Sequence, residues 1–78
     1  MNVKILGPGC ANCKRLEANV TEAIEALGAA ATVEKVTDYG AIAGYGVMST
    51  PGLVIDEAVV VSGRVPSVSE VTALLSRA

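Results

Sequence analysis

The chain changes its hydrophobic pattern abruptly at Gly7-Pro8-Gly9, and this break limits the folds it can adopt. The β-branched run "NVKIL" before the break is typical of a short strand. After the break, one face of a helix is indicated by apolar residues that recur at intervals of three and four: Cys13, Leu16, Val20, Ile24 and Leu27. Gly28 is a typical helix stop, and "TVEKV" then predicts a second short strand. A strand, a long helix and another strand predict a right-handed parallel βαβ unit.

The rest of the chain extends this unit. "TDYGAIAGYG" predicts a short helix capped by Thr37 or Asp38 and weakened by its glycines. "GLVID" and "AVVVS" predict a hairpin, although Asp56-Glu57 lacks the glycine that a two-residue turn prefers. "SVSEVTALLSRA" begins at Ser67 with the spacing of a capping box and predicts a terminal helix. The order β-α-β-α-β-β-α predicts an α/β fold, a four-stranded mixed sheet flanked by three helices.

Length and charge narrow the class of protein. The 78 residues predict a single domain that spans residues 1–78. A net charge of −2 without a basic block argues against a nucleic-acid partner. The apolar start is far too short for a signal peptide, and no apolar run approaches the ~20 residues of a membrane helix. We therefore expect a cytoplasmic monomer that binds neither nucleic acid nor membrane.

Cys10 and Cys13 are the only cysteines, and the chain has no histidine. In a reducing cytosol, such a close pair is more often catalytic or metal-binding than a structural disulfide. Cys13 shares the apolar face of the helix and should be buried, whereas Cys10 precedes the first turn and should be exposed. That difference suits thiol–disulfide exchange, in which an exposed thiolate attacks and a shielded thiol resolves the mixed disulfide. The helix N-terminus, with Lys14 and Arg15 nearby, favours the thiolate of Cys10.

Two thiols at the start of a helix also suit other roles. Two thiolates can hold Cu(I), and small heavy-metal-binding domains begin with a similar strand, glycine-rich loop and CxxC. Those domains run β-α-β-β-α-β and end on a strand, whereas this chain ends on a helix. A closed zinc site needs four ligands, more than this chain offers. Cys10 and Cys13 as small packing residues, or a scaffold that has lost catalysis, complete the alternatives.

Three segments resemble one family of proteins: "GPGCANCKRLEANV", "YGVMSTPGLVID" and "VVVSGRVPS". Nearly the whole chain is similar to thioredoxin-fold proteins, and most closely to the small thioredoxin-like redox-active disulfide proteins of prokaryotes. The resemblance implies that Cys10 is the nucleophile and Cys13 the resolving thiol. It also implies a cis-proline at Thr50-Pro51, where the backbone of Thr50 pairs with a bound peptide. Gly63 matches the glycine that shapes the same groove.

The chain departs from typical thioredoxins at several positions. Gly9 replaces the Trp before the nucleophile and leaves the approach to the substrate-binding side open. The first strand carries Lys4 and no carboxylate, so the buried Asp that assists the resolving thiol there has no counterpart in that strand. Glu17 lies one turn beyond Cys13 and is either a proton acceptor for that thiol or a solvated charge paired with a nearby Lys or Arg. The solvated pair is the more common arrangement.

The sequence thus predicts a thioredoxin-like protein disulfide oxidoreductase, with a Cu(I)-type metal-binding module as the alternative. Its expected partners are a disulfide-containing substrate protein and a recharging reductase that resembles thioredoxin reductase. Neither a cofactor nor a resident metal is expected, because the dithiol itself carries the electrons.

Overall fold

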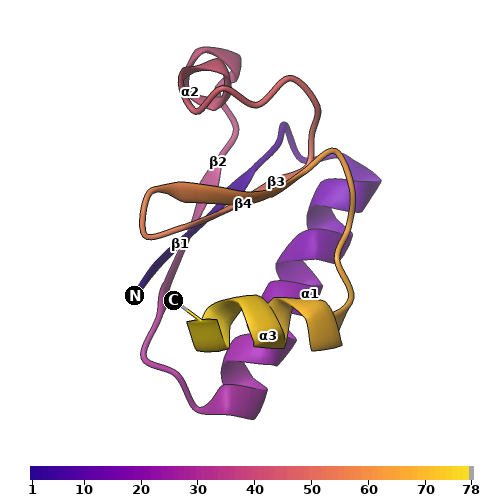
Figure 1. Ribbon diagram of the computed structural model, residues 1–78. Coiled ribbons are helices and arrows are strands. Elements are labelled where there is room, and N and C mark those ends of the chain that lie inside the picture. The colour runs from indigo at the N-terminus through magenta and orange to yellow at the C-terminus, as the bar shows by residue number, and fades with distance from the viewer. Residues whose placement is uncertain (78) are drawn as a thin grey trace.

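The structure, a computed structural model, describes residues 1–77. Its elements follow one another as β1 (Asn2–Leu6), α1 (Ala11–Leu27), β2 (Thr32–Val36), α2 (Tyr39–Gly44), β3 (Gly52–Ile55), β4 (Ala58–Ser62) and α3 (Val68–Arg77). This order confirms the predicted fold class, because three helices accompany one four-stranded mixed sheet (Figure 1). None of the helices described within residues 1–77 is both long enough and apolar enough to cross a membrane.

The ends of the four strands lie at two opposite ends of the sheet. Its strand order is β2-β1-β3-β4, with β1 parallel to β2 and antiparallel to β3. Leu6, the last residue of β1, lies opposite both Val36 and Gly52, and Gly52 lies opposite Ser62 at the end of β4. The carboxyl ends of β1, β2 and β4 therefore meet the start of β3 at one edge, which we call the C-terminal edge. In sheets of this kind, ligands bind beyond the carboxyl ends of the parallel strands.

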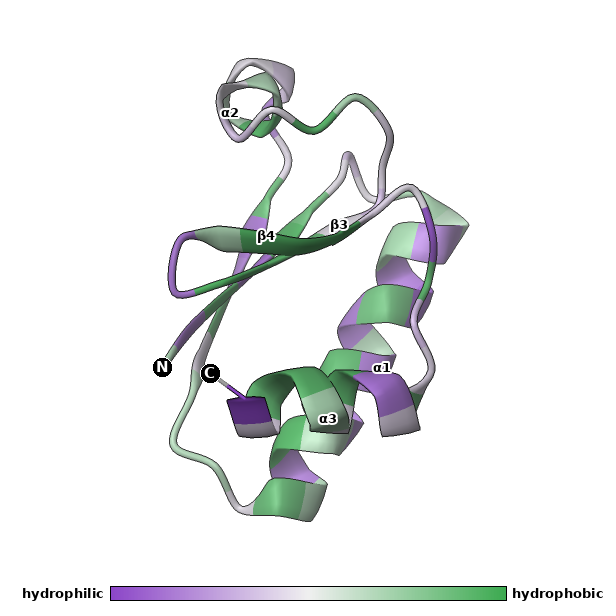
Figure 2. Ribbon diagram, in the orientation of Figure 1, coloured by the Kyte–Doolittle hydropathy of each residue, from purple (hydrophilic) through white to green (hydrophobic). Residues whose placement is uncertain are grey.

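The two faces of the sheet are covered unequally. Helices α1 and α3 lie together on one face, whereas α2 lies on the other side (Figure 1). The main core forms between the sheet and the α1–α3 pair from ten buried residues: Val3, Ile5, Leu16, Val20, Ala23, Leu53, Ile55, Val61, Val71 and Leu75. A smaller cluster joins the opposite face to α2: Leu6, Ile42, Val47 and Val54. Figure 2 shows the hydrophobic segments of the helices and strands that supply these clusters.

The ends of α1 are set by local interactions. Cys10 is the N-cap residue, and its Sγ accepts a hydrogen bond from the Cys13 N–H at 3.2 Å. The helix ends where Gly28 adopts a left-handed conformation with φ of 63°, which costs glycine little. The 17 residues between these caps match the helix that the apolar spacing predicts. This helix therefore begins directly after the first cysteine.

The other two helices have polar caps. Asp38 caps α2 by accepting a hydrogen bond from the Ala41 N–H at 2.9 Å. The hydroxyl of Ser67 accepts one from the Glu70 N–H at 3.1 Å, which is half of the predicted capping box. The carboxylate of Glu70 instead receives hydrogen bonds from Arg64 in the preceding loop. That pairing lowers the pKa of Glu70 and raises that of Arg64.

The turn between β3 and β4 functions without the glycine that its geometry favours. Asp56 and Glu57 have positive φ of 48° and 69°, as a tight hairpin requires. Asp56 exchanges two hydrogen bonds with Asn2, one from each N–H, and both are 2.8 Å long. Glu57 forms an ion pair with Lys4 at 2.8 Å. Contacts with β1 therefore hold a turn that is unfavourable locally.

Lys4 lies in the middle of β1 and links several elements. Its ammonium group donates a hydrogen bond to the Tyr45 hydroxyl at 2.7 Å and also pairs with Glu57. These two hydrogen bonds, the one with Glu57 foremost, raise the pKa of Lys4, and the pKa of Glu57 is lowered. Through these contacts Lys4 joins β1 to the hairpin and to the segment after α2. Its side chain is only 18% exposed.

Candidate active site

The two cysteines lie at the C-terminal edge, joined by a disulfide. Their Cα atoms are 5.0 Å apart. Cys13 is 4% exposed, whereas Cys10 is exposed at the start of α1. The structure therefore has the difference in exposure that the helical spacing predicts. An attacking group can reach only the Cys10 side of the pair directly.

Gly7 holds the end of β1 against the buried sulfur. Its N–H donates a hydrogen bond to the Val36 carbonyl at 2.9 Å. A Cβ at this position would overlap Sγ of Cys13 and would lie 3.2 Å from the Cβ of Cys13. The sequence pattern marks Gly7 only as part of the break after the first strand. The structure shows that the close approach of the backbone to Cys13 requires this glycine.

Thr50 and Pro51 lie beside this segment. The peptide bond between them is cis. Pro51 is buried, Thr50 is half-buried, and the Cβ of Thr50 would lie 3.9 Å from a Cβ at Gly7. Gly7 therefore lies between the Cys13 sulfur and the segment that enters β3.

Gly63, which follows β4, contacts the segment that contains Thr50 and Pro51. Its N–H donates a hydrogen bond to the Pro51 carbonyl at 2.9 Å. Its φ is 76°, and a Cβ there would lie 3.1 Å from the Cβ of Ser49, so a larger residue is disfavoured. Gly9, also with positive φ, is exposed and has open space around it. All six predicted site residues thus lie in loops or near the start of α1 at the C-terminal edge: Gly9, Cys10, Cys13, Thr50, Pro51 and Gly63.

Met48 is a surface feature that the sequence reasoning did not select. It precedes Thr50 by two residues and is 97% exposed, more than any other large hydrophobic side chain within residues 1–77. The sequence signal that could have marked it is a methionine directly before the polar pair Ser49-Thr50, next to the proline that begins the following strand. Exposed methionines adapt to apolar partners because the side chain is flexible and polarisable.

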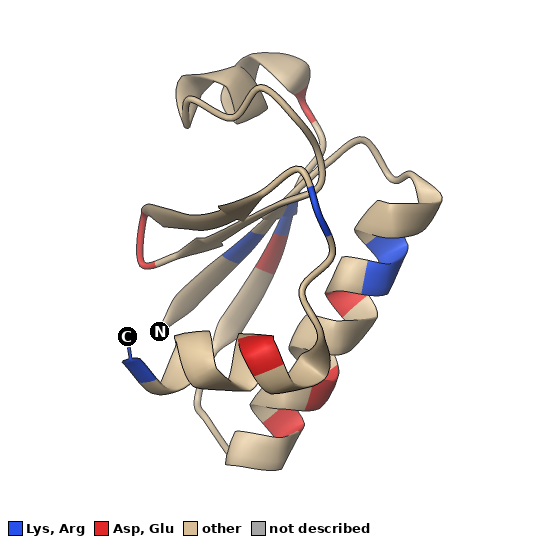
Figure 3. Cartoon of the chain, turned by 45° about the vertical axis from the view of Figure 1, so that its right-hand side comes forward, with Lys and Arg blue, Asp and Glu red and all other residues tan. Residues whose placement is uncertain are grey.

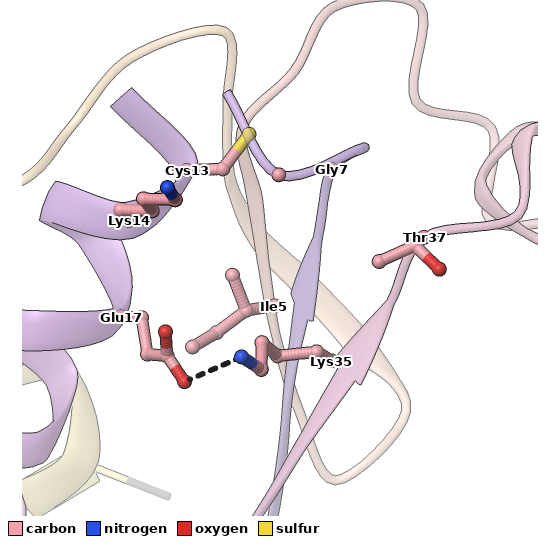
Figure 4. Close-up of a pocket in the computed structure, with 8 residues that line it drawn as sticks. Ile5, Gly7, Cys13, Lys14, Glu17, Lys35 and Thr37 are labelled. Atoms are coloured by element: carbon pink, nitrogen blue, oxygen red, sulfur yellow. Dashed lines mark ion pairs between the residues drawn. The ribbon is translucent and has the colours of Figure 1, made fainter. Parts of the chain in front are cut away.

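A pocket of about 130 Å³ opens beside Cys13, on the β2 side of the helix start. Its lining combines backbone, apolar and charged groups: Ile5, Gly7, Gly9, Cys13, Lys14, Glu17, Lys35 and Thr37 (Figure 4). Glu17 forms an ion pair with Lys35 of β2 at 3.3 Å, shown as a dashed line in Figure 4. The pairing of Glu17 with a lysine, one of the two arrangements considered from sequence, is therefore present.

Charge is distributed unevenly along α1. Its two basic residues, Lys14 and Arg15, lie in the first turns next to the disulfide, and its acidic residues follow further along (Figure 3). Positive side chains and the helix N-terminus both favour an anion at Cys10. Within residues 1–77, no group of three or more Cys, His, Asp or Glu side chains is placed to hold a metal ion.

The chain is similar to known proteins over nearly its full length. A family model described as "Thioredoxin domain" matches residues 1–76. A protein named thioredoxin from Methanothermobacter thermautotrophicus is 41% identical over 76 residues, which cover 97% of this chain and 99% of that protein. A protein of the same name from Methanocaldococcus jannaschii is 42% identical over 69 residues, which cover 88% of this chain and 79% of that protein.

Proposed function

The chain belongs to the thioredoxin-domain family, and on that premise we propose that Cys10 is its nucleophile and Cys13 its resolving thiol. The protein is a thiol–disulfide oxidoreductase, because its relatives are thioredoxins and a disulfide joins its cysteines in the CxxC spacing. The Cu(I)-binding alternative is not favoured, since both relatives carry the name of a redox protein. The observation that carries the assignment of roles is the exposure of Cys10 beside a buried Cys13.

The reaction proceeds in two exchanges. In the reduced protein, the Cys10 thiolate attacks one sulfur of a substrate disulfide and displaces the other sulfur as a thiolate. The Cys13 thiol then loses its proton and attacks Sγ of Cys10, which releases the second substrate thiolate. The Cys10–Cys13 disulfide closes, two electrons pass to the substrate, and each released thiolate takes up one proton.

The start of α1 prepares Cys10 for the first exchange. As the N-cap, its sulfur accepts the Cys13 N–H, one of the backbone donors that a helix start leaves without an internal partner. A thiolate makes a stronger bond to this donor than a thiol does, because a charged acceptor strengthens the hydrogen bond. Lys14 and Arg15 add positive charge to the same turn. These groups support Cys10 as the thiol that ionises and attacks.

The substrate binds along the C-terminal edge around the exposed sulfur. The backbone of Thr50 faces a bound peptide, Pro51 and Gly63 form the floor, and the absence of a side chain at Gly9 leaves the approach open. The Gly63 N–H bond to the Pro51 carbonyl supports this arrangement, because it joins the two loops beside the disulfide. Met48 offers an apolar contact at the rim.

The partners of the protein are disulfide substrates and a reductase that returns the pair to the dithiol state. We infer that this reductase is of the thioredoxin-reductase kind and that the protein acts as a cytoplasmic monomer, in one domain, without nucleic acid or membrane. The modest net charge of −2 and the absence of a basic block support the last point.

Reduction of insulin by dithiothreitol tests the roles of the two cysteines. We expect the native protein to accelerate insulin reduction and Cys10→Ser to abolish the acceleration. Cys13→Ser, the matched control, should keep its nucleophile and accumulate mixed disulfides that are visible by mass spectrometry without reductant. In the reduced native protein, Cys10 should alkylate much faster than Cys13. A Cys10→Ser variant with native activity, or equal alkylation rates, would contradict the assignment.

A further inference from the structure

We propose that the pocket beside Cys13 is a subsite for one apolar side chain of the substrate, a branched aliphatic or small aromatic residue next to the reacting cysteine. This inference rests on the proposed function, because it names the class of disulfide that reacts best at Cys10. It assigns an occupant to a cavity that neither of the two thiol–disulfide exchanges uses.

The pocket offers an almost wholly apolar surface to a group that enters it. Ile5 and Cys13, both buried, contribute apolar atoms from β1 and α1. Glu17 and Lys35 also line the pocket, but their charged groups pair with each other at 3.3 Å (Figure 4). Water held inside a protein typically makes about three hydrogen bonds, and this lining supplies few partners for them. An apolar group is therefore a better occupant than water.

The size of the pocket limits this occupant to a single side chain. Its volume is about 130 Å³, whereas pockets for whole drug-sized ligands measure roughly 300–1,000 Å³. An apolar cavity of about 150 Å³ binds one molecule of benzene. The pocket therefore accommodates a valine or leucine side chain or a single ring, and the double ring of tryptophan is too large for it.

The position of the pocket brings its occupant close to the reacting sulfur. Gly9 and Cys13 both line the pocket, and Gly9 directly precedes the exposed Cys10. A Cβ at Gly9 would meet no atom within 4 Å beyond its chain neighbours, so the space beside the exposed sulfur is open. Consecutive residues of an extended peptide are about 3.3–3.6 Å apart. A substrate whose cysteine reacts at Cys10 therefore presents its neighbouring side chain to the mouth of the pocket.

Thr37 is the position at which the pocket can be changed from outside. It lies in the loop after β2, is exposed, and lines the pocket opposite α1 (Figure 4). It belongs neither to the cysteine pair nor to the buried core. A larger side chain at this position should therefore occupy the pocket and leave the reacting sulfurs in place.

Reaction of the reduced protein with disulfide-linked dimers of blocked dipeptides tests the subsite. The dipeptides carry alanine, leucine or tryptophan either directly before or directly after their cysteine. In at least one of the two orders, we expect leucine to raise the second-order rate about tenfold over alanine, the lower end of what added methylene groups gain in a hydrophobic pocket. Tryptophan should gain less than leucine, because it exceeds the volume of the pocket.

Two matched variants of β2 and the loop after it make the kinetic result specific. Thr37→Phe should reduce the leucine-to-alanine ratio to about one and leave the rate of the alanine peptide native. Thr32→Phe makes the same change at an exposed position at the opposite end of β2, so it should keep the native ratio. Thr37→Ser, which adds no bulk, should also keep it. Circular dichroism of each variant checks that the fold is retained.

Benzene is a direct probe of the pocket in the oxidised protein. By NMR, it should shift the methyl signals of Ile5 and Thr37 in a saturable way, because both side chains line the pocket. The methyl signals of Val71, buried on α3 and outside this lining, should not move. Thr37→Phe should abolish the shift at Ile5. No shift at Ile5 up to the solubility limit of benzene would show that the pocket does not take an apolar group.

The kinetic results separate this inference from the proposed function. Equal rates for leucine and alanine in both orders, or a leucine preference that persists in Thr37→Phe, overturn the subsite and leave the oxidoreductase assignment intact. A rate that is highest for tryptophan overturns it as well, since general surface apolarity has no upper size. A Cys10→Ser variant that reduces these peptides at the native rate overturns the proposed roles of the cysteines instead.

Discussion

At the scale of single residues, the site depends on two glycines, which have no side chain, as much as on the two sulfurs. Gly7 allows the end of β1 to approach Cys13, and Gly9 leaves the exposed side of Cys10 uncovered. Met48 is the large apolar side chain near this edge that faces solvent. These positions lead to two predictions, one about packing and one about recognition.

Gly7→Ala should destabilise the protein by about 1–3 kcal/mol, the usual cost of overpacking a buried site. The added methyl group would overlap Sγ of Cys13, so either β1 or α1 must shift. Urea unfolding of the oxidised protein measures the change. Gly44→Ala is the matched control: it meets open space at the end of α2 and should be neutral or slightly stabilising. Equal stability of the Gly7→Ala variant and the native protein would show that the backbone does not constrain Cys13.

Met48→Ser should weaken the use of protein substrates and spare the reaction with small disulfides. The substitution should remove about 1 kcal/mol of apolar contact with the substrate, which corresponds to a KM for insulin about fivefold higher. The rate with dithiobis(nitrobenzoate) should not change, because this small reagent reacts at Cys10 and does not extend to Met48 at the rim. The melting temperature should stay native, since the side chain is 97% exposed. A native KM for insulin would remove Met48 from the proposed substrate surface.

At the scale of elements, the β3–β4 hairpin is the part most dependent on the rest of the fold. Its turn residues have positive φ although neither is glycine, and its stability comes from contacts with Asn2 and Lys4 of β1. The hairpin therefore forms its turn only with the first strand in place.

Asp56→Ala should cost about 1–2 kcal/mol of unfolding free energy. The substitution removes the carboxylate that accepts the Asn2 N–H and places alanine at φ of 48°, where a side chain without a local hydrogen bond is disfavoured. Chemical denaturation at neutral pH checks the value. Asp56→Asn keeps both an acceptor and tolerance of this conformation, so its stability should remain close to native. If both variants lose the same amount, charge rather than backbone geometry determines the effect.

The sequence predicts elements well where local signals agree. The strand at Asn2–Leu6 and the helix at Ala11–Leu27 match their apolar periods, and Gly28 supplies the helix stop. The hairpin turn was harder to predict because its partners lie more than fifty residues away in β1. Glu70 departs from the predicted capping box for another reason: the competing partner Arg64 lies in the preceding loop, whose path depends on the rest of the fold.

The prediction of the site follows the same rule. Cys10 and Cys13 are apparent from spacing, because their exposure depends on one helix. The position of Gly7 against Cys13 and the pairing of Glu17 with Lys35 depend on how α1 packs on the sheet. Periodicity along the chain does not contain that information. The sequence indicates a Lys or Arg partner for Glu17, but only the structure identifies it as Lys35 and shows how closely Gly7 approaches Cys13.

At the scale of the whole molecule, two ion pairs join different elements of the fold. Lys4 of β1 pairs with Glu57 of the hairpin, and Arg64 pairs with Glu70 of α3. In both pairs the basic partner lowers the pKa of the carboxyl group through hydrogen bonds. Figure 3 shows that the positions of basic and acidic residues are spread over helices, strands and loops.

These pairs predict the direction of the acid response. A carboxyl group whose folded pKa lies below its unfolded value stabilises the protein above the unfolded value of about 4.3. That contribution is lost as pH falls through the folded pKa. Urea midpoints measured from neutral pH to about pH 2 should therefore fall in acid, with a shallow slope because both carboxylates are exposed. A Glu57→Gln/Glu70→Gln variant should fall less steeply, and a slope equal to that of the native protein would refute the contribution of these pairs.

The hydrogen bond from Gly63 to Pro51 has a consequence for how such a protein diversifies. It joins two loops into one unit that contains no reactive atom, whereas the disulfide and its capping donor belong to a single turn of α1. Under the proposed function the protein is therefore modular: the reacting sulfurs lie in one short stretch of chain, and most of the surface that contacts the substrate lies in another. Loops transplanted between paralogues at the second unit should exchange their clients while the chemistry stays the same.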